Sequence, residues 1–119
     1  MVAWLRKLFQ LAVTPSEGTV SAYRRPLGYQ QITSGTLGSA TNLTLPTPIA
    51  NLGLVPGYAI IQCEGTTSSV RWRDDGTAPT STIGMILSTG GELDYSGDLN
   101  KIQFILATGT PILNISFYA

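Results

Sequence analysis

The sequence contains no histidine and only one cysteine. The absence of histidine from all 119 residues removes the commonest general base and the commonest neutral metal ligand. The single thiol, Cys63, excludes an intrachain disulfide. Because Cys63 alternates with Ala59 and Ile61, we expect it to be a buried strand residue that does not react. Composition therefore argues against zinc sites and against cysteine–histidine catalysis.

Long hydrophobic runs are also missing. The apolar run near the start, Leu8 to Val13, spans about six residues and includes Gln10. This is shorter than the roughly 7–15 apolar residues of a signal peptide and far shorter than a membrane span. We therefore expect a soluble intracellular product with no membrane partner.

Charge is scarce and unevenly distributed. Only 12% of residues are charged and the formal net charge is zero, so no global field attracts nucleic acid. Residues 1–28 hold four basic residues and one acidic residue, a net charge of +3, whereas residues 29–119 hold three basic and six acidic residues, a net charge of −3. The sequence predicts a basic amino-terminal piece, a mildly acidic body and no nucleic-acid partner.

What the chain does contain is apolar alternation. Apolar residues make up 43% of the sequence, and from Ile32 onward they recur at every second position, which is typical of strands with one buried face. The clearest strands cover residues 58–64, 70–73, 102–106 and 113–118, with weaker candidates at 42–45, 81–87 and 92–95. We predict an all-β fold, a β-sandwich or jelly-roll-like single domain over residues 32–119.

Residues 1–31 are predicted to form an extended N-terminal arm. Apolar residues near the start recur at helical spacing, which predicts a short amphipathic helix ending near Pro15. Residues 14–31 show no sustained period. The arm docks on a partner or, alternatively, folds back on its own domain. The predicted arm interface consists of Trp4, Leu5, Leu8, Phe9, Leu11, Arg24 and Arg25.

The stretch from Val70 to Pro79 concentrates charge around a tryptophan. Alternation predicts that Val70 and Trp72 point into the core and that the arginines between and after them point outward. An Asp-Gly pair then favours a turn, because glycine adopts positive φ without penalty. The predicted interface on the body consists of Arg71, Arg73, Asp74 and Asp75.

The sequence lacks the residues that a metal site or an enzyme active site would need in this stretch. A calcium loop requires oxygen ligands at alternating positions, which the segments around Asp75 and Asp94 do not supply. A glycosidase requires two carboxylates facing across a cleft, and nothing in the sequence marks out such a pair. Phosphate-binding loops and nucleophile elbows are absent from the sequence as well. We expect no catalytic residue, no metal and no cofactor, and therefore not an enzyme.

The strand pattern over about residues 33–118 resembles a group of small virion structural proteins of tailed bacteriophages. The most specific parts are Arg71-Trp72-Arg73-Asp74-Asp75-Gly76 followed by Pro79, and Tyr95-Ser96-Gly97-Asp98-Leu99. The resemblance implies a β-sandwich decoration (cement) protein in the virion, made in the host cytoplasm. It further implies a homo-oligomer, with a trimer favoured, that binds the major capsid protein or other virion proteins.

Other functions remain open within this resemblance. Small phage structural proteins also serve as head–tail connectors and as tail or fibre components. A carbohydrate-binding β module is a further alternative, because it needs exposed aromatic side chains beside polar groups. The tyrosines that could supply these are Tyr23, Tyr29, Tyr58, Tyr95 and Tyr118.

Overall fold

A computed structural model describes residues 24–48 and 53–119. These residues form eight strands and one 3-10 helix, which confirms the all-β prediction. No described helix is long and apolar enough to cross a membrane. In chain order the elements are β1 (Pro26–Ile32), η1 (Thr36–Gly38), β2 (Thr41–Asn42), β3 (Tyr58–Glu64), β4 (Ser69–Arg73), β5 (Met85–Ser88), β6 (Glu92–Tyr95), β7 (Gln103–Thr108) and β8 (Ile112–Tyr118).

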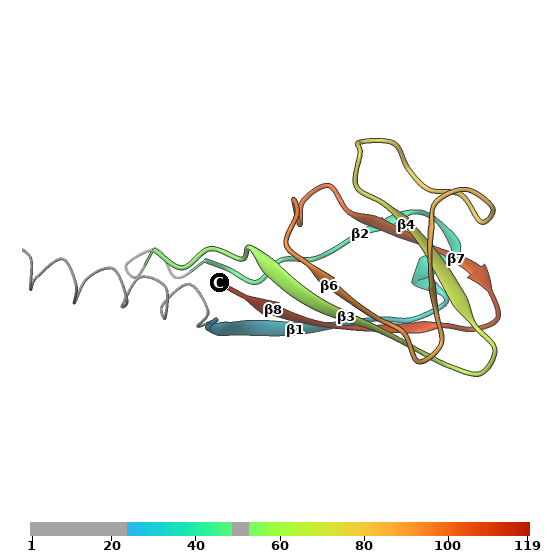
Figure 1. Cartoon of the computed structure of the whole chain (residues 1–119), viewed down its shortest axis with the longest axis horizontal. Helices are drawn as coiled ribbons and strands as arrows, with labels where there is room; N and C mark the ends of the chain where they lie inside the picture. The colour runs from blue at the N-terminus through green and yellow to red at the C-terminus, as the bar shows by residue number, and fades with distance from the viewer. Residues whose placement is uncertain (1–23, 49–52) are drawn as a thin grey trace, which may run out of the picture.

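The strands form two four-stranded antiparallel sheets packed face to face. Their orders are β1-β8-β3-β6 and β2-β7-β4-β5. Four nested pairs explain these orders, because β1 pairs with β8, β2 with β7, β3 with β6 and β4 with β5. One long antiparallel hairpin rolled into two layers gives this arrangement, which is the jelly roll. Figure 1 shows the first sheet along the lower side of the domain and the second above it.

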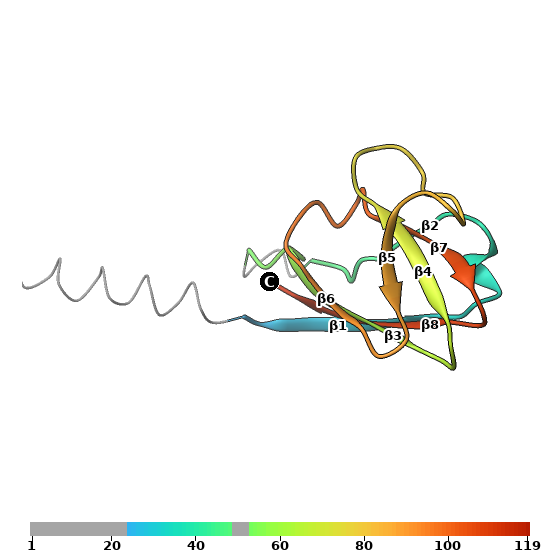
Figure 2. The ribbon, with the colours of Figure 1, turned by 45° about the vertical axis from the view of Figure 1, so that its right-hand side comes forward.

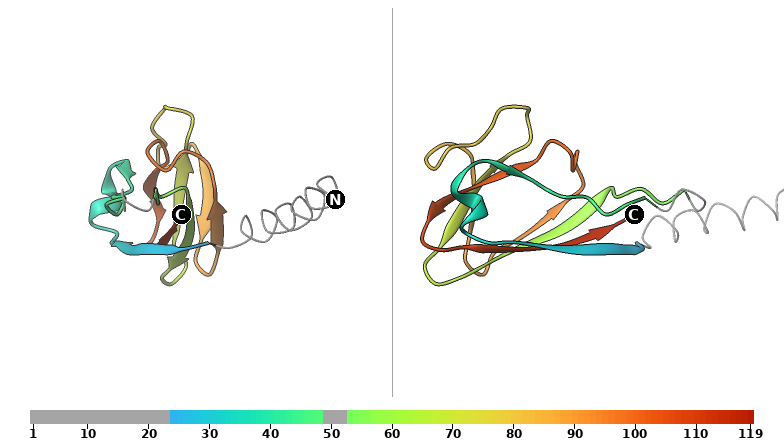
Figure 3. Two further views of the ribbon diagram at one scale, coloured as in Figure 1. Left: turned by 90° about the vertical axis from the view of Figure 1, so that its left-hand side faces the viewer. Right: turned by 180° about the vertical axis from the view of Figure 1, so that it is seen from behind.

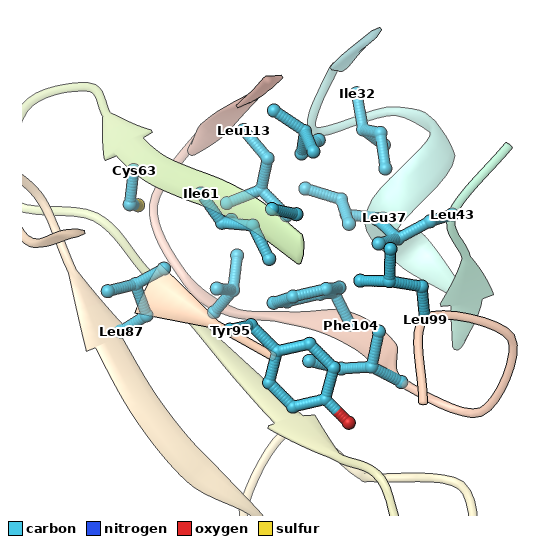
Figure 4. Packing of buried hydrophobic residues seen from close by; sticks show 14 of the residues in the cluster. Ile32, Leu37, Leu43, Ile61, Cys63, Leu87, Tyr95, Leu99, Phe104 and Leu113 are labelled. Carbon is cyan, nitrogen blue, oxygen red and sulfur yellow. The ribbon is translucent and has the colours of Figure 1, made fainter. Parts of the chain in front are cut away.

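The core lies between the two sheets and follows the predicted alternation. Every second residue of β3 and β8 is buried, and Phe104 of β7 is fully enclosed among them. Cys63 is 2% exposed and belongs to this cluster, as predicted. Figure 4 shows side chains from both sheets meeting in one apolar cluster, which Leu37 of η1 and Leu43 extend.

The predicted boundary between arm and body is wrong by several residues. Residues 26–31 belong to β1, which pairs with β8 along its whole length. A register shift between Pro26 and Gly28 changes which side chains face inward, so apolar alternation is blurred at the start of the strand. Arg25 and Ala119 extend the ladder with two backbone hydrogen bonds of 3.1 and 2.9 Å. The sandwich therefore begins before residue 32.

The weaker strand predictions had mixed outcomes. Residues 92–95 form β6 as predicted, whereas the expected strand at 42–45 is the two-residue β2. The predicted strand at 81–87 is wrong over its first part. Thr80 and Ile83 exchange backbone hydrogen bonds that close a turn, and β5 begins only at Met85. The loop before β5 projects from the domain in the views of Figures 2 and 3.

Candidate functional site

Strand β4 places Arg71 beside the projecting loop. The Arg71 Nη1 donates a 2.8 Å hydrogen bond to the Gly84 carbonyl oxygen, and its Nε donates a 3.3 Å hydrogen bond to that of Ser81. Gly84 has a φ of +141°, and a Cβ there would lie only 3.1 Å from the Cβ of Arg71. The predicted outward direction of Arg71 is compatible with these contacts, but its guanidinium is already used to hold the loop.

Arg73 and Asp75 form a bidentate ion pair at the base of the loop. The Arg73 Nε and Nη2 donate to the two Asp75 carboxylate oxygens at 3.1 and 2.5 Å. The backbone N–H of Thr77 also donates to Asp75 at 3.3 Å, and Gly76 has a φ of +89°. Hydrogen bonding with Arg73 lowers the pKa of the Asp75 carboxyl. The sequence correctly predicted the turn.

Asp74 accepts a hydrogen bond from a buried tyrosine in the other sheet. The Tyr95 hydroxyl donates to Asp74 Oδ2 at 2.8 Å, and the side chain of Tyr95 is 6% exposed. In Figure 4 the Tyr95 ring lies on the apolar cluster with its oxygen pointing out of it. Burial, followed by hydrogen bonding to Asp74, raises the pKa of Tyr95 well above its ordinary value. The hydroxyl thus remains a donor at neutral pH.

These contacts join the two most specific segments of the sequence pattern into one unit. Tyr95 contacts Trp72 edge to face, with ring centroids 6.1 Å apart and planes at 72°. A Cβ on Gly97 would overlap the Tyr95 hydroxyl, so glycine is needed there. Asp98 holds the following turn, because its carboxylate accepts the backbone N–H of Asn100 at 2.9 Å. The pattern therefore encodes a junction between the two sheets.

The junction offers little for acid–base chemistry. Asp74 is hydrogen-bonded to Tyr95 and Asp75 is paired with Arg73, so neither carboxylate is positioned as a free acid or base. Among residues 24–48 and 53–119, no three acidic or thiol side chains are grouped closely enough to hold a metal ion. What the arrangement can do is hold a surface in a fixed shape.

That surface is an open groove of about 550 Å³ beside the junction. Trp72 and Met85 line it, and Met85 is 60% exposed. Ile83, in the loop before β5, also lines it and is exposed. Ile86 is exposed too, but it pairs with Arg71 and points to the other face of β5. Sequence reasoning missed this apolar surface, because the run Ile83–Leu87 was predicted to be part of a half-buried strand.

Trp72 packs against the core as its predicted inward direction requires, but it is not enclosed. Val70 is completely buried as predicted, whereas Trp72 is only half-buried and packs against the edge of the core. Trp72 pairs in register with Met85, and the exposure of Met85 shows that the inner face of the sheet is uncovered at this point.

The residues predicted for the arm interface divide into two groups. Arg24 and Arg25 lie on the sandwich: the Arg24 guanidinium stacks 3.7 Å above the Tyr58 ring, and Arg25 extends the β1–β8 ladder. The other predicted residues lie outside the described part of the chain: Trp4, Leu5, Leu8, Phe9 and Leu11.

Comparisons with known proteins give no further guide to function. No family model matches the chain, and no curated protein matches it significantly.

Proposed function

We propose that this chain is a structural protein of a tailed-bacteriophage virion that decorates the capsid lattice and has no enzymatic activity. The resemblance of the two joined segments to small phage virion proteins supports this function. The jelly roll supports it as well, since this fold is frequent among viral capsid proteins. Because a fold alone does not define a function, the proposal depends mainly on the exposed surface.

The observation that carries the proposal is the apolar surface around the groove. Ile83 and Met85 are 57% and 60% exposed, and both line the groove at one edge of the second sheet beside Trp72. Large apolar side chains that cluster on a surface mark protein interaction sites. The ionic and polar contacts of Arg71, Arg73 and Asp74 at the same place give the surface a fixed shape and a polar rim, as in many protein interfaces.

We assign the capsid shell protein as the partner of this surface. The amino-terminal residues add a second contact in the proposal, since residues 1–28 carry a net charge of +3 and an apolar stripe. A rigid body joined to a basic segment suits a protein that connects neighbouring shell subunits. We propose a homo-oligomer with a trimer favoured, because cement proteins occupy symmetric positions on a lattice.

Binding to undecorated capsids tests the surface directly. We expect the double variant Ile83→Ser and Met85→Ser to lose capsid binding while keeping its melting temperature, because both residues are exposed. Val55→Ser is the matched control, since Val55 is 62% exposed and does not line the groove. Capsid binding unchanged by the double variant would rule out this surface.

Location in the intact particle tests the function itself. Copies spread over the whole shell support decoration, whereas a few copies on one axis indicate a head–tail connector, tail or fibre component. Deleting residues 1–23 tests the arm without removing β1, which starts at Pro26. We expect the truncated protein to stay folded and to bind capsids more weakly.

A further inference from the structure

The outer face of the first sheet carries aromatic and polar side chains in aligned rows. On β3 and β8 the even-numbered residues point away from the core. Cross-strand pairing sets Tyr29 beside Ser116 and Ser116 beside Ile60. The neighbouring row sets Asn114 beside Gln62. The face is therefore a regular surface that spans all four strands.

An open hollow of about 290 Å³ lies in the middle of this face, where the side chain of Ser116 is short. Ser116 and Ile60 form its floor, and the rings of Tyr29 and Tyr118 form part of its wall. Tyr29 is 65% exposed, so its ring is available to a ligand. Three interstrand spacings separate β1 from β6, which is about 14 Å, and the hollow extends from Tyr29 on β1 to Glu92 on β6.

Hydrogen bonds fix the polar side chains at one end of the hollow. Asn114 Oδ1 accepts hydrogen bonds from the Tyr29 hydroxyl at 2.5 Å and from Gln31 Nε2 at 3.0 Å. The Asn114 amide nitrogen donates to Glu64 Oε1 at 2.8 Å. These bonds place the amide and the Tyr29 ring in fixed positions, so a ligand does not have to order them.

Hydrogen-bonding capacity is left over beside this network. Gln62 Nε2 donates to Glu92 Oε1 at 3.1 Å. Within the described part of the chain, the amide oxygen of Gln62 and the second carboxylate oxygen of Glu92 accept no hydrogen bond. Both oxygens belong to residues that line the hollow. They are suited to accept hydrogen bonds from the hydroxyl groups of a ligand.

The charge of the face selects against anions. Three carboxylates point outward from β3 and β6, those of Glu64, Glu92 and Asp94. The Arg24 guanidinium stacks on the Tyr58 ring at the end of β3, whereas Glu92 itself lines the hollow. A phosphate backbone or an acidic sugar placed in the hollow would meet like charge. A neutral ligand rich in hydroxyl groups can instead donate hydrogen bonds to the oxygens of Gln62 and Glu92.

We propose that this hollow binds a short neutral oligosaccharide. A pyranose ring has an apolar face of C–H groups that packs on an aromatic ring, and hydroxyl groups at its edge. Tyr29 and Tyr118 supply the aromatic surface, and Gln62 and Glu92 accept the hydroxyl groups of the sugar. The hollow is longer than one ring, so two linked sugars fill it. This activity is separate from capsid binding, which uses the second sheet.

Saturation-transfer NMR on the full chain tests the proposal. The probes are maltotriose, cellotriose, chitotriose and lactose, with sialyllactose as the anionic counterpart of lactose. We expect transfer to at least one neutral sugar, and weaker transfer to sialyllactose than to lactose. No transfer to any of the neutral sugars would overturn the proposal.

Matched variants locate the site. Tyr29→Ala is expected to lower affinity about five- to tenfold, the loss of one aromatic contact. Tyr29→Phe keeps the ring and should retain most of the binding. Val55→Ala changes an exposed apolar residue that does not line the hollow and should have no effect. An affinity unchanged by Tyr29→Ala would place the sugar elsewhere and overturn the assignment.

The face could instead be covered by a second copy of this chain. Size-exclusion chromatography with light scattering tests this alternative. We expect wild type and Tyr29→Ala to have the same oligomeric state and melting temperature. An oligomer that dissociates in Tyr29→Ala would show that copies of the chain cover the face, and would overturn the proposal. Because sugar binding is measured on isolated protein, its failure leaves the capsid experiment unaffected.

Discussion

Removing one hydroxyl group tests whether the junction between the sheets stabilises the fold. Tyr95→Phe keeps the ring in the core and its edge contact with Trp72. It deletes the 2.8 Å hydrogen bond to Asp74 and a longer one, 3.4 Å, to the Asp98 carbonyl oxygen. The tyrosine is buried, with 6% exposed, whereas Asp74 is exposed to water. The variant therefore isolates one hydroxyl group, whose shorter hydrogen bond links Tyr95 to the end of β4.

The expected loss follows from these surroundings. A hydrogen bond to a charged group contributes about 1.5–3 kcal/mol, and the cost is lower when water replaces the lost partner. Water can reach Asp74, so we expect Tyr95→Phe to lower the free energy of unfolding by about 1–1.5 kcal/mol. For a domain of this size the melting temperature should fall by about 4–10 °C.

Thermal and denaturant unfolding measure this loss. Tyr118→Phe is the control, because the Tyr118 hydroxyl makes no hydrogen bond within the described residues. Asp74→Ala combined with Tyr95→Phe should show a coupling close to the single loss. An unchanged melting temperature in Tyr95→Phe, or additive effects in the double variant, would refute the reasoning.

The pH dependence supplies a second check on the same bond. The pKa of Tyr95 is raised in the folded protein, so the neutral hydroxyl stabilises the fold fully below about pH 10, the ordinary pKa of tyrosine. This stability is lost as the pH rises further. The difference in stability between wild type and Tyr95→Phe should therefore be constant near neutral pH and decrease above about pH 10.

Two further predictions concern the core and its edge. Trp72→Ala should lower the free energy of unfolding by about 2–3 kcal/mol, below the usual range of about 3–5 kcal/mol for a fully buried tryptophan. The reason is that the indole is only half-buried. A larger loss in denaturant unfolding would show that the indole is enclosed. Cys63 is 2% exposed and burial raises the pKa of its thiol, so a thiol reagent at mildly alkaline pH should label it only after unfolding. Rapid labelling of native protein would contradict this.

The sequence predicted most of the sandwich because apolar alternation directly reflects the two faces of a strand. Strands β3 and β8 combine clear alternation with full burial of one face, and β7 buries Phe104 fully and Leu106 in part. β1 was not predicted because its bulge interrupts the alternation. Its central residues, Tyr29, Gln30 and Gln31, are also polar or exposed, so they show no apolar pattern. Edge strands have fewer buried contacts, so their residues carry a weaker pattern.

The candidate site was predicted only in part, for a related reason. Local chemistry predicted the Asp75–Gly76 turn but did not single out Asp75 as the partner of Arg73. The hydrogen bond from Tyr95 to Asp74 joins residues 21 positions apart in different sheets, and no local pattern encodes it. The outer hollow likewise depends on register between β1, β8 and β3, which alternation does not determine.

The two backbone hydrogen bonds between Arg25 and Ala119 have a mechanical consequence. These residues close the β1–β8 ladder at the end where β1 begins, and β1 is the edge strand of its sheet. A pull applied across the strand direction through the chain before Arg25, with the body held fixed, loads this ladder at its terminal pair. Hydrogen bonds loaded in this way break one after another, as in a zipper, and each needs little force. The stacking of Arg24 on Tyr58 resists the first step of this peeling.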